Sequence, residues 1–165
     1  ISAREFADAL DSARAFAQSQ SEECLNTLCA ILYPCHLSHE KNMLSDHNIR
    51  MKRLAYEIRY GILIWFSGLV EYLSSHPIYK ILFSSRSGRF DSDKITLGMS
   101  ETIMHLALIG FGSRKELEAC SVIDYFDMQI KSLKKMIADA LGKGAKREDI
   151  AKQTQLPYNL IDKLI

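Results

Sequence analysis

The chain contains few of the residues that interrupt helices: of 165 residues, only 3 are Pro and 8 are Gly. Pro removes a backbone donor and Gly is costly inside a helix, so both tend to stand where helices end. They cluster here in a few places, which favours long helices. With 47% hydrophobic and 25% charged residues, the chain has the composition of a soluble protein with a core of its own. We therefore predict an all-α fold.

Sequence motifs for catalysis and nucleotide binding are also missing. There is no Gly-x-Ser-x-Gly and no phosphate-binding loop, and Gly110-Phe-Gly112 lacks the third Gly and the leading strand of a dinucleotide site. The paired carboxylates Glu22-Glu23 and Glu148-Asp149 fall in the first turns of predicted helices, where the helix dipole accounts for them. His105 lies in an apolar helix and is expected to be a core histidine. We expect neither enzymatic activity nor a cofactor.

Paired metal-binding cysteines are absent as well. Cys35, His36 and His39, with Cys24 and Cys29 before them and His47 beyond them, are the nearest approach to a zinc site. Structural zinc sites, however, usually have ligands paired at tight spacing, which this stretch lacks. We therefore predict no bound metal, and we expect reduced, buried thiols in a cytoplasmic protein. The four cysteines are Cys24, Cys29, Cys35 and Cys120.

No apolar run is long enough to cross a membrane. The longest, Gly61–Val70, has ten residues before Glu71, whereas a spanning helix needs about 20. It instead forms the second half of a predicted helix from Asp46 to Leu73. Because this half is apolar nearly all round, we expect it to run through the centre of a helical bundle.

Local signals predict the other helices. The stretches Ser2–Glu5 and Ser113–Glu116 have the spacing of a capping box, in which a hydroxyl and a carboxylate satisfy free backbone N–H groups. Ser84–Asp93 has the composition of an exposed loop, and Ile78–Phe83 fits either a short helix or a strand. The remaining predicted helices run over residues 3–18, 22–33, 100–111 and 114–141, the last either straight or bent.

Charge is unevenly distributed along the chain. Residues 1–128 contain 13 Lys/Arg and 16 Asp/Glu, a net charge of −3, whereas residues 129–165 contain 8 and 4, a net charge of +4. A basic end is what phosphate contact requires, although lysines also cover solvated helix surfaces. We therefore predict a helical bundle, 1–128, and a basic unit, 129–165. Because the first residue is Ile rather than Met, we expect a fragment or a processed form.

The basic unit ends in two short predicted helices. The first begins near Arg147 and carries Ile150 and Ala151 inward. Pro157 cannot continue this helix, because it lacks an N–H, but it suits the first position of a new one. The second helix then carries Leu160, Ile161 and Leu164 on one face. Two helices and a turn between them result.

This pattern resembles the helix-turn-helix motif of DNA-binding proteins. The motif has a small residue where the helices cross, which Ala151 matches. Two positions depart from it, since Thr154 stands where an apolar residue is usual and Gln155 where Gly is usual. The resemblance covers about 20 residues and concerns a motif, not the whole chain. The matching apolar positions are Ile150, Leu156, Ile161 and Leu164.

The resemblance implies that the second helix enters the major groove of duplex DNA and that its exposed residues meet base edges. Asn159 would pair with adenine, and Lys163 would reach guanine or phosphate. The protein would be a transcriptional regulator, and a homodimer, because such motifs commonly bind two half-sites. Residues 1–128 would then serve dimerisation or sensing. The implied DNA-binding residues are Lys146, Arg147, Lys152, Gln155, Tyr158, Asn159, Asp162 and Lys163.

Two further interpretations stay open. The apolar residues of the C-terminal stretch can simply pack a helical hairpin against the bundle. The chain can also be a helical protein-interaction module, in which the apolar residues of Ile62–Val70 face a protein partner. Salt separates the last interpretation from DNA binding, because phosphate contacts weaken steeply with salt and apolar contacts do not.

Overall fold

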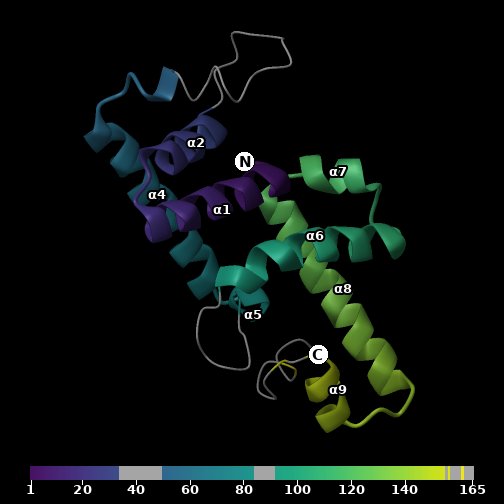
Figure 1. Cartoon of the computed structure of the whole chain (residues 1–165). Helices are drawn as coiled ribbons and strands as arrows, with labels where there is room; N and C mark the ends of the chain where they lie inside the picture. Colours follow the sequence, from purple (N-terminus) through teal and green to yellow (C-terminus); the bar gives the residue numbers. More distant parts are fainter. Residues whose placement is uncertain (34–49, 84–91, 155, 157–160, 162–165) are drawn as a thin grey trace. The chain divides into compact units, whose positions relative to one another are not determined.

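The computed structural model describes residues 1–33, 50–83, 92–154, 156 and 161, and this part of the chain is all-α, as predicted (Figure 1). It contains eight helices and no strand within those residues. No helix in the same residues is long and apolar enough to cross a membrane. The helices are α1 Ala3–Ser19, α2 Glu22–Leu32, α4 Tyr56–Ser75, α5 Lys80–Phe83, α6 Ser92–Leu108, α7 Arg114–Ala119, α8 Val122–Gly142 and α9 Arg147–Thr154.

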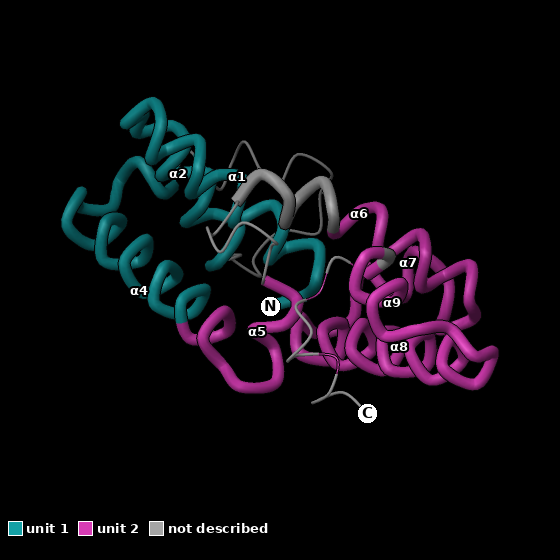
Figure 2. The backbone as a smooth tube through the Cα atoms, turned by 90° about the horizontal axis from the view of Figure 1, so that it is seen from below, with its two compact units in different colours: residues 1–71 teal, residues 72–165 magenta. Residues whose placement is uncertain are grey.

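Contacts divide the chain into two compact units, residues 1–71 and 72–165 (Figure 2). The boundary falls inside α4, so that helix contributes to both units. The predicted division into a helical bundle, 1–128, and a basic unit, 129–165, is a division by function. The two compact units do not test it, and it stays a prediction.

In the first unit, α1 and α2 form a helical hairpin. The capping box at Ser2 is confirmed: the Glu5 amide donates to the Ser2 hydroxyl, and the Ser2 amide donates to the Glu5 carboxylate at 2.8 Å. Gln20 ends α1 in a left-handed conformation, with φ of 53°, and the Ser21 hydroxyl caps α2. The core side chains of these two helices are Ala3, Phe6, Ala9, Leu10, Phe16, Leu25, Leu28, Cys29 and Ala30.

The predicted helix from Asp46 to Leu73 is interrupted. Residues 52–55 form a turn and a bend, and α4 begins only at Tyr56; residues 46–49 lie outside the described part. Arg59, Phe66 and Leu73 lie on the buried face of α4 at intervals of seven residues. A continuous helix would carry Lys52 to that face, and a second buried charge there is unfavourable unless it is paired. The turn leaves Lys52 exposed.

The apolar half of α4 is also not buried all round. Phe66 and Val70 are buried, and the Phe66 ring lies 5.6 Å from that of Phe6. Ile64 and Trp65, in contrast, are more than half exposed. The one charged residue of the buried face, Arg59, is 5% exposed and donates to Glu22 and to the Asn26 side-chain oxygen.

One cysteine of this unit matches the prediction of buried thiols. Cys29 is fully buried, and burial raises the pKa of its thiol to about 11, against the opposing effect of the Arg59 charge. Cys24 and Cys120 are only half-buried, and Cys35 lies outside the described residues. All three described cysteines carry free thiols.

In the second unit, aromatic side chains join α8 to the segment around α5. The Phe126 ring lies 5.8 Å from Tyr79 and 5.6 Å from Phe83. The Tyr79 hydroxyl donates to Asp127 at 3.1 Å, and the buried Tyr125 hydroxyl donates to the Met99 carbonyl of α6 at 3.2 Å. The Ile78–Phe83 stretch, which fitted a helix or a strand, ends in the short helix α5.

Two boundaries in this unit differ from the sequence-based expectation. Helix α6 begins at Ser92 rather than Ser100, so its first two residues fall in the stretch expected to be a loop. The helix predicted over 114–141 breaks into α7 and α8, because Cys120 is extended and the Ser121 hydroxyl accepts from the Asp124 amide to cap α8. The capping box of Ser113 and Glu116, which opens α7, is confirmed.

Candidate nucleic-acid interface

The basic C-terminal segment begins where α8 ends. The Lys143 amide closes the last turn of α8, and Gly144 follows with φ of 80°, a left-handed conformation that suits Gly. The chain then starts α9, and the Lys146 carbonyl accepts from the Ile150 amide at 3.1 Å. A turn of a few residues therefore separates a long helix from a short one (Figure 1).

The apolar residues of the helix-turn-helix pattern face inward wherever the structure describes them. Ile150 is 2% exposed, Leu156 8% and Ile161 0%. Helix α9 carries the first of these three, Leu156 follows its end, and Ile161 is again helical. Leu164, the fourth apolar position of the pattern, lies outside the described residues.

Ala151 differs from its expected place. The pattern predicted a fully buried small residue at a helix crossing, but Ala151 is only half-buried. The adjacent Ile150 takes the inward position on α9 and buries a much larger apolar surface. The prediction that Ala151 lies in the core is therefore wrong.

Thr154 explains one departure from the motif. Its hydroxyl donates to the Ile150 carbonyl at 2.7 Å and accepts from the Leu156 amide at 3.4 Å. One side chain thus satisfies a carbonyl in the last turn of α9 and an amide just beyond it. An apolar side chain, the usual choice in the motif, cannot make either bond.

Basic side chains surround this short helix. Lys146 and Arg147 stand at its start and Lys152 near its end, and all three are exposed. Glu148 and Asp149 lie in the first turn, where they offset the positive end of the helix dipole. The structure therefore brings three of the eight expected DNA-binding residues onto α9 and its start. Gln155, Tyr158, Asn159, Asp162 and Lys163 lie outside the described residues.

Helix α8 adds lysines that motif matching did not single out. Lys131, Lys134 and Lys135 are exposed on it, and Lys143 is exposed at its end. The positive net charge of residues 129–165 was the sequence signal for these lysines. A net charge, however, does not say which residues would contact a ligand or which helix face carries them. Their placement on one helix depends on α8 running without interruption from Val122 to Gly142.

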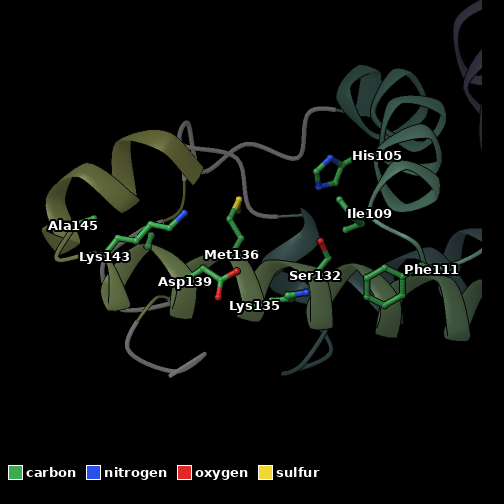
Figure 3. Close-up of a pocket in the computed structure, with 10 residues that line it drawn as sticks. His105, Ile109, Phe111, Ser132, Lys135, Met136, Asp139, Lys143 and Ala145 are labelled. Carbon is green, nitrogen blue, oxygen red and sulfur yellow. The ribbon is translucent and has the colours of Figure 1, made fainter.

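A hollow of about 580 Å³ lies beside the C-terminal half of α8 (Figure 3). In Figure 3 the Ser132 and Met136 side chains rise from α8 toward His105 and Ile109. Lys135, Asp139 and Lys143 follow one another at intervals of four on α8, so this helix face carries more positive than negative charge. The lining residues are His105, Ile109, Phe111, Ser132, Lys135, Met136, Asp139, Ala140, Lys143 and Ala145.

His105 corrects another expectation. The sequence placed it in the core, but it is exposed and lines this hollow. Its helix buries Ile103 and Leu106, so the position between them falls on another side of α6. The lining combines apolar side chains with two lysines and one carboxylate, that of Asp139.

Four residues of the metal-like cluster, Cys35, His36, His39 and His47, lie outside the described part, whereas Cys24 and Cys29 lie on α2 and carry free thiols. Within the described part, no three His, Cys, Asp or Glu side chains are grouped closely enough to hold a metal ion.

No family model, no curated protein and no solved structure matches this chain.

Proposed function

We propose that residues 129–165 bind duplex DNA through a helix-turn-helix-like unit, and that the protein is a cytoplasmic, non-enzymatic transcriptional regulator. The observation that carries the proposal is the burial of Ile150, Leu156 and Ile161. They are three of the positions that the motif requires to face inward; Ala151, at the expected helix crossing, is only half-buried, and Leu164 lies outside the described residues. The flanking basic residues are left on the surface, where phosphates can reach them.

Affinity would come mainly from charge. Lys146, Arg147 and Lys152, with the lysines of α8, provide exposed positive groups on neighbouring segments. Such groups release counterions from DNA and position the protein without reading sequence. Sequence preference would come from the second helix of the motif, where Tyr158, Asn159, Asp162 and Lys163 are the proposed base-reading residues and Gln155 the turn residue.

The experiment is a titration of labelled duplex DNA of mixed sequence with the whole chain, at several salt concentrations, followed by fluorescence anisotropy. We expect the logarithm of the binding constant to fall linearly with the logarithm of salt concentration. Selection from random duplexes then supplies a preferred site. An affinity that does not change with salt, or no affinity for any duplex at low salt, contradicts the proposal.

A second function is supported by a different observation. On α4, Ile58, Ile64 and Trp65 are each more than half exposed, an unusual amount of bare apolar surface for one helix. A helical protein-interaction module would use such a surface to bind a protein partner. Binding of that kind persists at high salt, so the same titration series distinguishes the two functions.

A further inference from the structure

The hollow beside α8 lies where three segments of the second unit meet. Its lining comes from the end of α6 and the residues just beyond it, from the C-terminal half of α8, and from Ala145 in the turn before α9. Its volume of about 580 Å³ falls within the range of about 300–1,000 Å³ that small-molecule sites occupy. The hollow is therefore large enough for a small organic molecule.

Apolar side chains form much of this lining. Ile109 and Met136 are 44% and 40% exposed, and Phe111 is half-buried. In Figure 3, Met136 rises from α8 toward Ile109. An apolar group bound between them would remove these surfaces from water, which is favourable in proportion to the area that it buries.

The end of α8 fixes one side of the hollow. The Ala145 amide donates to the Ala140 carbonyl at 3.0 Å, and the Gly144 amide donates to the Leu141 carbonyl at 2.9 Å. These two bonds form a Schellman motif, which holds the backbone at the end of a helix. Ala140 and Ala145 both line the hollow. A bound molecule would therefore contact backbone that is already ordered, which reduces the entropic cost of binding.

The charged side chains of the lining carry both signs. Asp139 lies four residues from Lys135 and four from Lys143, so the three are neighbours along α8. All three are exposed, and among the ion pairs of the described residues none joins Asp139 to either lysine. A ligand with one group of each sign can pair with Asp139 and with a lysine at the same time. A simple anion would meet the carboxylate of Asp139, and a simple cation would meet the lysines.

We propose that the hollow binds a small zwitterion with an apolar body, of the class of an α-amino acid with a large apolar side chain. The ligand's ammonium group pairs with Asp139, its carboxylate pairs with one of the two lysines, and its apolar group packs against Met136 and Ile109. Because exposed ion pairs contribute little, we expect a modest affinity, with a Kd of roughly 0.1–1 mM. Binding of this kind does not depend on the proposed DNA binding and is tested without DNA.

Met136 provides a local probe of binding. The whole chain would be labelled with ¹³C at its methionine methyl groups and titrated with L-phenylalanine, with the NMR signals assigned by Met→Leu variants. We expect the Met136 signal to shift and to saturate. Met104, which is 49% exposed but does not line the hollow, is the internal control and should shift much less. No saturable shift of Met136 up to about 10 mM ligand, or equal shifts of both signals, overturns the proposal.

Three related molecules test the class of ligand. Phenethylamine lacks the carboxylate of L-phenylalanine, 3-phenylpropionate lacks its ammonium group, and glycine lacks its apolar side chain. We expect each to bind at least about fivefold more weakly than L-phenylalanine, because each leaves one part of the lining unmatched. Binding of any of the three as tightly as L-phenylalanine overturns the zwitterion assignment.

Asp139→Asn removes the charge of the carboxylate and keeps its shape. It should weaken binding of L-phenylalanine by at least about fivefold and strengthen binding of 3-phenylpropionate, because the repulsion between two carboxylates is lost. Glu101→Gln is the matched control, since it neutralises an exposed carboxylate of α6 outside the lining. It should leave both affinities within about twofold of the wild type. Circular dichroism would establish that both variants keep their helix content. Unchanged affinities in Asp139→Asn, or equal changes in both variants, overturn the proposal.

Discussion

The C-terminal segment and α4 differ in whether they bury apolar or charged side chains. Around α9, Ile150 is buried while the lysines beside it are exposed. On α4, Ile58 and Trp65 are exposed while a charged residue, Arg59, is buried. Under the proposed function the first region would contact a polyanion, whereas a protein partner would contact the exposed apolar side chains of α4. The two proposals therefore assign different partners to the two regions.

The largest expected effect comes from placing a charged side chain in the apolar core of the C-terminal unit. Ile150→Asp should destabilise the C-terminal unit by more than about 3 kcal/mol, because a carboxylate would be buried in an apolar site. Limited proteolysis should then cleave this unit rapidly. Lys146→Asp, which adds the same group at an exposed position, is the control and should leave the cleavage rate nearly unchanged. Equal resistance of Ile150→Asp and wild type would contradict the helix-turn-helix interpretation.

Replacing Arg59, the buried charged residue of α4, gives the next largest expected effect. Arg59→Ala should lower the free energy of unfolding by about 2–4 kcal/mol, because it removes buried packing and leaves the Asn26 side-chain oxygen without its donor. Urea denaturation followed by circular dichroism measures this loss. Arg53→Ala, at an exposed position of the preceding turn, should change the free energy by less than about 0.5 kcal/mol. Similar losses in both variants would mean that the inward placement of Arg59 is unimportant.

Thr154 tests how the turn is held. Thr154→Val keeps the shape but removes the hydroxyl that bonds to Ile150 and Leu156. We expect a loss of about 1 kcal/mol in the C-terminal unit, seen as faster hydrogen exchange of the Leu156 amide. Thr154→Ser keeps the hydroxyl and should retain most of the protection. Protection that follows side-chain size rather than the hydroxyl would refute this account.

The smallest expected effect concerns a single phosphate contact. Lys146→Ala should reduce the slope of the salt dependence of DNA binding by about 0.9 and weaken binding to all duplexes alike. Lys52→Ala removes an exposed lysine from the first unit and should leave the slope unchanged. If both variants reduce the slope equally, DNA binding is not confined to the C-terminal segment.

Local signals in the sequence predicted local structure well. The capping boxes at Ser2 and Ser113 could be recognised because their donors and acceptors lie three residues apart. Helix boundaries without such a signal were predicted less well. The start of α6 at Ser92 and the turn after residue 51 both differ from the expectation.

The candidate site, too, could be predicted from the sequence only in part. Its basic character and the inward positions Ile150, Leu156 and Ile161 followed from charge and spacing. The half-buried state of Ala151, the two bonds of Thr154 and the exposure of His105 did not. Hydrophobic spacing indicates that a residue can face inward, but it does not say which of two adjacent residues, such as Ile150 and Ala151, will do so.

By itself, the sequence determined that the chain is helical, where several helices begin, and that positive charge gathers at its C-terminal end. These properties depend on backbone geometry and composition, which act over a few residues. Only the tertiary structure decided that Arg59 is buried while Trp65 is bare. The physical reason is that burial depends on which surfaces meet. Glu22 and Asn26, more than 30 residues from Arg59 along the chain, supply the groups that let a guanidinium replace an apolar side chain on the buried face of α4.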